Sequence, residues 1–414
     1  MTTPAVSFVA LLALVTGTRL WLLRRQRTAV LGARSQVPVE FAADVPLDAH
    51  QKAADYTNAK IRIGAIAVLI EAGVALLITV GGGLALIDDY LRAQGLEGLT
   101  LGLAVIGAIA AISTLIGWPL SIYHTFVIEK RFGFNRTTWA LYLADRLKAL
   151  ILALLLGAPL LAAILWLMRE AGRWWWLDAW IVWFAFNLVL LWAYPAFIAP
   201  WFNRFLPLAD EALKARVEAL IARCGFSSRG VFVMDGSRRS SHGNAYFTGF
   251  GSNKRIVLYD TLIERLSAEQ VEAVLAHELG HYRLRHIRRR LIVSAITSLA
   301  GLAVLGWLAR QPLFYATFDV TQPSPHAALV LFAVAAPLCT FWITPLAAAW
   351  SRRHEFEADQ FAAAHVESQA LAHALVSLYK DNATSLTPDP VYSFFHDTHP
   401  PARARIARLR RSTA

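Results

Sequence analysis

Five consecutive residues, His277-Glu278-Leu279-Gly280-His281, have the types and spacing of a metallopeptidase centre. On a helix, the two histidines are four residues apart and share one face, so both imidazoles can reach one cation. Glu278 follows the first histidine and can address a water molecule beside the metal. Zinc lowers the pKa of such a water to about 7, and a carboxylate can take its proton as the water attacks a polarised carbonyl. We therefore predict one zinc ion per chain and hydrolysis of peptide bonds.

A catalytic zinc usually has three protein ligands and an open position, so a third ligand is expected elsewhere in the chain. The best candidates are Glu355 and Asp359, which are four residues apart on a predicted helix. One carboxylate can bind zinc while the other accepts a hydrogen bond from a ligand imidazole and fixes its tautomer. Spacing does not assign the two roles, and it leaves His354 and Glu357 open as well.

The residues around the motif predict short strands followed by a capped helix. Segments rich in Val, Ile, Phe and Tyr and bounded by Gly or Ser are expected to be strands, namely 229–235, 244–250 and 255–259. Ser267-Ala268-Glu269-Gln270 then has the form of a capping box. We expect the helix that it opens to carry the motif and to run past Arg290 into the apolar segment beyond.

The remainder of the chain is too apolar for a soluble protein. Of its 414 residues, 56% are hydrophobic, against about 45–50% in ordinary globular domains. A membrane-spanning helix needs about 20 mostly apolar residues. Seven segments approximately meet this requirement: 5–23, 63–87, 99–120, 149–168, 175–199, 291–309 and 327–350. We therefore expect a mainly α, polytopic membrane protein with about seven transmembrane helices.

Two polar regions, 201–290 and 351–414, are each small for an independent domain. We expect them to pack together as a small α+β, zincin-like catalytic domain. The first would contribute the strands and the zinc motif, and the second the third zinc ligand. Residues 1–200 would then hold transmembrane helices one to five with their cytoplasmic loops, and residues 291–350 would hold helices six and seven.

The distribution of charge predicts the orientation in the membrane. Lys and Arg outnumber Asp and Glu by 40 to 29, and the excess is in the first, third and fifth connections and the C-terminal tail. The positive-inside rule places these segments, the catalytic domain and the C-terminus in the cytoplasm. Glu71, within the second span, is expected to face protein or water, or else to lie near a tilted helix end. Basic residues are not interleaved with stacking aromatics, so no nucleic-acid partner is predicted.

Further segments carry a resemblance that covers most of the chain. They are Ile128-Glu129-Lys130-Arg131-Phe132-Gly133-Phe134-Asn135-Arg136-Thr137-Thr138, the stretch from Tyr194-Pro195 to Pro207-Leu208, Ser240-Ser241-His242-Gly243-Asn244-Ala245-Tyr246-Phe247 continuing to Lys254-Arg255-Ile256-Val257-Leu258, and Ser351-Arg352-Arg353-His354-Glu355-Phe356-Glu357-Ala358-Asp359. Together with the zinc motif, these segments resemble the type I CAAX prenyl protease family, the integral-membrane zinc metalloendopeptidases.

The resemblance implies roles for individual residues. Glu355 would be the third zinc ligand, and Asp359 would hold a ligand imidazole. Asn244 and Ala245 would lie on an edge strand whose backbone pairs with an extended substrate, a known mode of peptide recognition.

The tail segment His399-Pro400-Pro401-Ala402-Arg403-Ala404-Arg405 also resembles a family motif. There His399 would donate a hydrogen bond to the oxyanion, and Arg405 would bind near the substrate or an active-site carboxylate. Other histidines are expected not to bind metal: His124, His242, His286, His326 and His396.

The family architecture is a ring of seven helices around a water-filled intramembrane chamber capped by the catalytic domain. Its members remove the last three residues of a prenylated Cys-aliphatic-aliphatic-X terminus, so the expected partners are a peptide or protein substrate and membrane lipid. The oligomeric state stays open. The expected location is the inner membrane of a bacterium or the endoplasmic reticulum membrane of a eukaryote.

Two other functions are alternatives to a CAAX prenyl protease. One is a membrane quality-control metalloprotease that degrades misfolded membrane proteins. The other is a seven-helix transporter or receptor with a structural zinc, for which a closed four-ligand site is typical. Glu278 beside the first ligand argues against the latter. An intramembrane-cleaving protease is disfavoured because residues 271–290 are too charged to lie in lipid.

Overall fold

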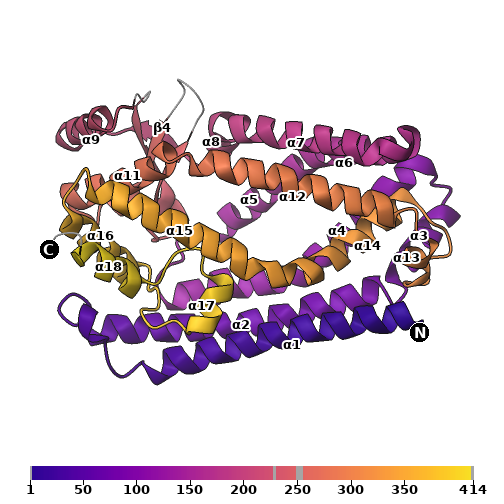
Figure 1. Cartoon of the computed structure of the whole chain (residues 1–414), viewed down its shortest axis with the longest axis horizontal. Coiled ribbons are helices and arrows are strands. Elements are labelled where there is room, and N and C mark those ends of the chain that lie inside the picture. Colours follow the sequence, from indigo (N-terminus) through magenta and orange to yellow (C-terminus); the bar gives the residue numbers. More distant parts are fainter. Residues whose placement is uncertain (1, 227–229, 249–254, 412–414) are drawn as a thin grey trace.

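Long helices run side by side along the molecule, and the sheet lies at one end of them (Figure 1). The structure is a computed structural model that describes residues 2–226, 230–248 and 255–411. Helices α9, α11, α16 and α18 gather around the sheet, whereas the N-terminus, α3 and α13 lie at the opposite end (Figure 1). The sheet and the helices near it therefore form one end of a mostly helical molecule (Figure 1).

The helices, in chain order, are α1 Thr3–Gly32, α2 Leu47–Ile78, α3 Gly83–Ala93, α4 Gly98–Tyr123, α5 Trp139–Leu152, α6 Ala158–Glu170, α7 Trp175–Ala193, α8 Ala199–Phe202, α9 Glu211–Arg223, α10 Asp260–Ile263, α11 Ala268–Arg283, α12 His286–Leu308, α13 Pro312–Ala316, α14 Pro325–Thr340, α15 Thr344–Ala363, α16 Ser368–Asp381, α17 Pro390–His396 and α18 Ala402–Arg411. The strands are β1 Phe205–Pro207, β2 Val231–Met234, β3 Ala245–Thr248 and β4 Arg255–Tyr259. The π-helical segments Ala153–Gly157 and Tyr194–Ile198 join α5 to α6 and α7 to α8, and a third, His124–Glu129, extends α4.

Seven helical stretches are long and apolar enough to cross a membrane. They are Thr3–Gly32, Leu47–Ile78, Gly98–Glu129, Trp139–Glu170, Gly172–Phe202, His286–Leu308 and Pro325–Ala363. This confirms the mainly α, seven-span architecture for the described part of the chain. Five of the predicted spans lie wholly inside one of these stretches, and a sixth, 291–309, extends one residue beyond its stretch.

The second predicted span, 63–87, is wrong at its C-terminal end. Helix α2 already ends at Ile78, and α3 begins separately at Gly83. The cause is the run Gly81-Gly82-Gly83. Gly82 has a φ of +75°, which favours glycine, and a Cβ on Gly83 would lie 2.6 Å from the Leu77 carbonyl oxygen. The apolar residues beyond this turn therefore belong to a different helix.

The four-stranded sheet has the order β1-β2-β4-β3. Strands β2 and β4 are parallel, whereas β1 and β3 pair antiparallel with their neighbours. Strand β3 is thus at an edge, with Ala245 opposite Leu258. The three predicted strands are confirmed, and 255–259 has the same bounds as β4. The other two are shorter than predicted where the structure describes them, and residues 229 and 249–250 lie outside the described residues. Strand β1 was not predicted because it has only three residues and includes a proline.

One hydrophobic core joins the two polar regions of the sequence. Leu275 and Leu279 of α11 pack with Ile256 and Leu258 of β4, and Leu371 of α16 belongs to the same cluster. All five are at most 1% exposed. The core fixes α11 against the sheet on one side and against the C-terminal helices on the other.

A separate cavity of about 890 Å³ lies among α1, α2, α4 and α14, and aliphatic side chains form most of its wall. Glu71 lines it and accepts a hydrogen bond from Arg19 at 2.8 Å. The carboxylate within the second span therefore lines a cavity and pairs with a counter-charge.

Candidate metal centre and active site

Helix α11 places the two motif histidines on one face. The Ser267 side chain accepts a hydrogen bond from Gln270 N, and the Gln270 side chain accepts one from Ser267 N, so the predicted capping box is confirmed. From this fixed start, His277 and His281 point the same way, and their Nε2 atoms lie 3.2 Å apart.

Gly280 lets α15 approach this face closely. A Cβ at Gly280 would lie 3.1 Å from both the Cα and the carbonyl oxygen of Ala358, a distance tighter than nearly all real contacts. The close approach brings Glu355 within 3.4 Å of His277 Nε2 and within 3.3 Å of His281 Nε2. His277, His281 and Glu355 thus form a cluster whose ligand atoms all lie within 4.8 Å of one another.

A buried chain of polar groups supports His277 from behind. Its Nδ1 lies 2.9 Å from Asp359 Oδ1. Arg405 then donates two hydrogen bonds to the same carboxylate, from Nε at 2.8 Å and from Nη2 at 2.6 Å. All three side chains are less than a tenth exposed. The two acids that spacing left interchangeable are therefore in different places, with Glu355 toward both Nε2 atoms and Asp359 toward Nδ1.

The surroundings raise the pKa of two titratable groups at the site, His277 and Glu278. Burial lowers the pKa of the His277 imidazole, but the hydrogen bonds to Asp359 and Glu355 outweigh it and raise this pKa to about 9. Burial also raises the pKa of the Glu278 carboxyl above its usual range, opposed by the neighbouring His277 and His281. A carboxyl with a raised pKa is a stronger base, as proton abstraction requires.

The remaining predicted site residues line one cavity of about 440 Å³ beside the cluster. They are Asn244, Ala245, Glu278, His399 and Arg405. His399 is 64% exposed, with its Nε2 3.6 Å from Glu355 Oε1. Burial of part of the ring lowers the pKa of the His399 imidazole, opposed by the nearby Glu355 carboxylate. The cavity also has walls from Tyr379 and Asn382, which no sequence motif singled out.

A second polar cluster adjoins the first and was missed by the motif analysis. His281 Nδ1 lies 3.0 Å from His286 Nδ1, and His286 Nε2 lies 3.1 Å from Glu357 Oε2. The rings of His286 and His354 stack at 4.0 Å with an angle of 11° between their planes. His124, His242, His326 and His396 belong to neither cluster within the described residues.

The second cluster depends on a helix break that corrects another prediction. The motif helix does not run past Arg290, because α11 ends at Arg283 and α12 begins at His286. Between them Arg285 adopts a φ of +59°. Residues five apart on a continuous helix would point about 140° away from each other. The break turns His286 back toward His281, which the sequence spacing alone does not reveal.

Two family models together match almost the whole chain. The model described as CAAX prenyl protease N-terminal, five membrane helices, matches residues 26–204. The model of peptidase family M48 matches residues 207–413, which include both parts of the histidine and carboxylate cluster.

Curated relatives and a solved structure agree with these matches. The CAAX prenyl protease 1 homolog of Arabidopsis thaliana is 39% identical over 314 residues, covering 74% of this chain and 73% of the relative. CAAX prenyl protease 1 of Saccharomyces cerevisiae is 36% identical over 325 residues, covering 74% of this chain and 71% of the relative. The crystal structure of S. mikatae Ste24p matches with a TM-score of 0.93 and 29% identity over 99% of both chains.

Proposed function

This chain belongs to the CAAX prenyl protease family of M48 peptidases, and from that premise we propose that it cleaves prenylated proteins, with His277, His281 and Glu355 holding one zinc ion. The family makes the chain a membrane metalloendopeptidase, so neither the quality-control protease nor the transporter or receptor is favoured. The relatives are named for the CAAX sequence, and we extend that substrate class here. The cut would follow the prenylated cysteine and release three residues.

The observation that carries the proposal is the triangle of His277, His281 and Glu355. The two Nε2 atoms lie 3.2 Å apart, and each lies 3.3–3.4 Å from a different carboxylate oxygen of Glu355. These spacings are close to the value of about 3.3 Å that separates the ligands of a tetrahedral zinc with bonds of about 2.0–2.1 Å. Glu355 Oε2 is buried and has no hydrogen-bond partner among the described residues. Two imidazoles with one carboxylate is also a recurring donor set of catalytic zinc. These features support zinc as the metal.

The chain's own residues supply the remaining chemistry. When bound, zinc would polarise the substrate carbonyl and acidify a water molecule. Glu278 lines the same cavity and would accept the proton of the attacking water, then pass it to the leaving amine. The hydroxyl of Thr398 lies 3.2 Å from His399 Nδ1. It can donate there, which leaves the His399 Nε2–H free to bind the oxyanion.

Asp359 and Arg405 would act through His277. The carboxylate accepts the Nδ1–H of His277 and so keeps Nε2 unprotonated toward the metal. Arg405 holds the carboxylate with two hydrogen bonds and balances its buried charge. Its Nη1 also lies 3.9 Å from Glu355 Oε2.

Strand β3 would receive the substrate backbone. On one side it pairs with β4, and the described residues place no strand on its other side. Asn244 Oδ1 accepts a hydrogen bond from Ala245 N at 2.8 Å. A substrate carbonyl would take over this donor as the peptide adds to the edge, which is the usual mode of strand addition.

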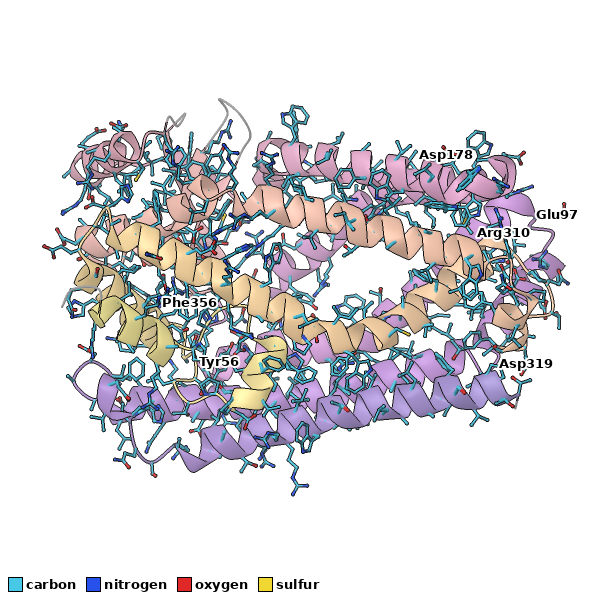
Figure 2. All side chains as sticks on the ribbon, viewed as in Figure 1. Tyr56, Glu97, Asp178, Arg310, Asp319 and Phe356 are labelled. Carbon is cyan, nitrogen blue, oxygen red and sulfur yellow. The ribbon has the colours of Figure 1, made fainter. Side chains whose placement is uncertain are left out.

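The arrangement of the two ends supports an orientation with the catalytic end in the cytoplasm. Glu97, Arg310 and Asp319 lie at one end of the helices and Phe356 toward the other (Figure 2). The metal cluster is on α11 and α15 at the latter end, where the basic connections predicted to be cytoplasmic also lie. We divide the chain accordingly into a membrane part, residues 1–200 and 291–350, and a catalytic part, residues 201–290 and 351–414. Helix α15 crosses the boundary between the two parts.

Orientation can be measured with single cysteines in a background lacking Cys224 and Cys339. Glu97, Asp319 and Glu367 are all exposed. Cysteines replacing Glu97 and Asp319 should react with an impermeant reagent in intact cells, whereas one replacing Glu367 should react only after permeabilisation. Labelling of the Glu367 position from outside would reverse the proposed orientation.

The substrate class is tested with a farnesylated peptide that ends in Cys-aliphatic-aliphatic-X. The purified chain should release the C-terminal tripeptide, and Glu278→Gln should not. The same peptide without the farnesyl group is the matched control. Equal cleavage of both peptides would agree with the proposed peptidase activity but would contradict a requirement for a prenylated substrate.

A further inference from the structure

A second cavity opens beside the metal centre, and apart from Thr398 and His399 its lining residues have no part in the proposed hydrolysis. It has a volume of about 500 Å³, within the range of about 300–1,000 Å³ that is usual for small-ligand sites. It shares four lining residues with the cavity at the metal cluster: Tyr379, Asn382, Thr384 and His399. A peptide lying at the metal can therefore continue into it.

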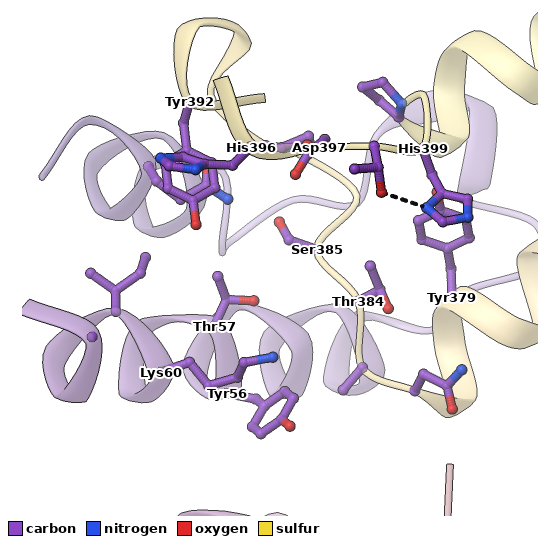
Figure 3. A pocket seen from close by; sticks show the side chains of 18 of the residues that line it. Tyr56, Thr57, Lys60, Tyr379, Thr384, Ser385, Tyr392, His396, Asp397 and His399 are labelled. Atoms are coloured by element: carbon purple, nitrogen blue, oxygen red, sulfur yellow. Dashed lines mark hydrogen bonds between the residues drawn. The ribbon is translucent and has the colours of Figure 1, made fainter. Parts of the chain in front are cut away.

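The walls of this cavity come from α2 and from the segment after α16. Thr57 and Lys60 of α2 lie across from Thr384, Ser385 and His399 (Figure 3). Hydroxyl groups and apolar residues such as Leu23, Ile61 and Pro400 line it together. Such a mixed wall suits a short peptide with aliphatic side chains.

Lys60 is the lysine of this cavity, and no described carboxylate forms an ion pair with it. Its ammonium lies 4.9 Å from the centre of the Tyr56 ring. That ring is fixed, because its hydroxyl donates to Glu129 and its faces pack near Phe132 and Phe134 at 5.2 and 5.0 Å. The cavity therefore presents an exposed cation, held beside the Tyr56 ring, that has no ion-pair partner in the described part of the chain.

Asp397 also lines the cavity, so the local charge is not purely positive. Burial raises the pKa of its carboxyl above the ordinary value. The Asp397 carbonyl is already held by Arg352 at 2.7 Å.

We propose that this cavity binds the three residues released from the substrate and that Lys60 pairs with their C-terminal carboxylate. The inference rests on the proposed function, in which the scissile bond is three residues from that terminus. Three extended residues span about 10 Å, so the carboxylate would lie in a cavity adjoining the metal centre. Recognition of the free terminus would then select C-terminal over internal cleavage sites.

The test compares two farnesylated peptides that differ only in a C-terminal carboxylate or carboxamide. A charge-assisted hydrogen bond of this kind is worth about 10–100-fold in affinity. The wild type should prefer the acid in kcat/KM by at least about tenfold. Lys60→Met should lose this preference by slowing only the acid, and Lys60→Arg should keep it.

Lys52→Met is the matched control. Lys52 is exposed on the same helix and lies 4.8 Å from the Phe134 ring, yet it faces a different cavity. It should leave the preference unchanged. Binding of both peptides to Glu278→Gln, read by fluorescence anisotropy, gives the same comparison without turnover.

Equal use of acid and amide by the wild type, or an unchanged preference in Lys60→Met, would overturn the carboxylate site while the peptidase stands. Failure of the wild type to cleave either peptide would instead count against the proposed function, and the binding comparison would still decide the role of Lys60.

Independently, the geometry points to His286 as a positioning residue for His281. With the His281 Nδ1–H donating to His286 Nδ1 at 3.0 Å, the His286 Nε2–H faces Glu357 Oε2 at 3.1 Å. Arg289 and Arg353 hold that carboxylate at 3.2 and 3.0 Å. His281 would thus have its own support, separate from the Asp359 support of His277.

A second metal at His286, His354 and Glu357 fits less well, although their atoms are close enough. The two imidazole planes are nearly parallel at 4.0 Å. Their in-plane lone pairs then run side by side, and one cation cannot lie in both planes. The two arginines on Glu357 also already neutralise it.

Metal affinity, measured by competition with a chromophoric chelator, separates these roles. Loss of a support of this kind typically weakens metal binding about 10–100-fold, which is expected for His286→Phe. His354→Phe keeps the stacked ring and should retain full affinity and one metal per chain. Glu357→Leu should weaken binding without a large change in thermal stability. Unchanged affinity in both His286→Phe and Glu357→Leu would overturn the role, as would a second metal lost in His354→Phe.

Discussion

Replacing Asp359 with asparagine would keep the shape of the side chain but remove the charge between His277 and Arg405. The carboxylate now faces three donors, His277 Nδ1 at 2.9 Å and Arg405 Nε and Nη2 at 2.8 and 2.6 Å. An asparagine has one carbonyl oxygen, and its NH₂ group must face one of these donors. In either orientation a buried polar contact is lost.

Two effects of different size follow from Asp359→Asn. If the NH₂ group faces His277, it favours the tautomer with the proton on Nε2, the atom that would bind zinc. Loss of such a support lowers metal affinity about 10–100-fold, or about 1.4–2.7 kcal/mol. Arg405 also stays buried without its partner, which costs about 3–5 kcal/mol of stability. Glu355 at 3.9 Å offers partial compensation, so the lower end of that range is expected.

Chelator competition on the purified protein measures the affinity, and thermal unfolding of the metal-free protein measures the stability. Asp389→Asn is the matched control, because Asp389 is buried and receives two hydrogen bonds from Arg25, away from the metal cluster. It should lower stability without changing metal affinity. An affinity within twofold of the wild type in Asp359→Asn would refute the tautomer argument.

Three further outcomes are expected. Glu278→Gln should keep its metal but lose at least about 10²-fold in kcat, since general-base catalysis typically contributes that much; near wild-type turnover would assign the base to another group. His399→Ala should keep its metal and lose about 10²–10³-fold in kcat, as for one oxyanion donor, and an effect confined to KM would contradict the role. The pKa of about 9 at His277 means that metal binding at pH 7 displaces a proton, so affinity should rise about tenfold per pH unit toward pH 9. Calorimetry in buffers of different ionisation enthalpy counts that proton, and a pH-independent affinity would exclude it.

The seven spans were predictable because length and apolarity are local properties of the chain. The errors in the predicted helix boundaries have local causes too, but only one of these causes can be read from the sequence. The glycines at 81–83 are a turn signal in the sequence, but the span was predicted from its number of apolar residues alone. The left-handed conformation of Arg285 is not readable, since that residue type rarely adopts it.

The site was predictable to the extent that its parts are local. The spacing of His277 and His281 identifies a shared helix face, but it cannot place a third ligand that lies more than 70 residues away. Only the approach of α15 over Gly280 separates the position of Glu355 from that of Asp359. The contact of His286 with His281 depends on the helix break at Arg285, and the cavity at Lys60 depends on the packing of α2 against the tail.

His277, His281 and Glu355 are proposed to hold one catalytic zinc together. Elemental analysis of purified wild type and Glu355→Ala, side by side with hydrolysis of the farnesylated peptide, tests this assignment. The wild type should contain one zinc per chain and cleave the peptide. Glu355→Ala should lose most of the zinc and the activity together. Full zinc occupancy in Glu355→Ala would remove this carboxylate from the metal and contradict the proposed centre.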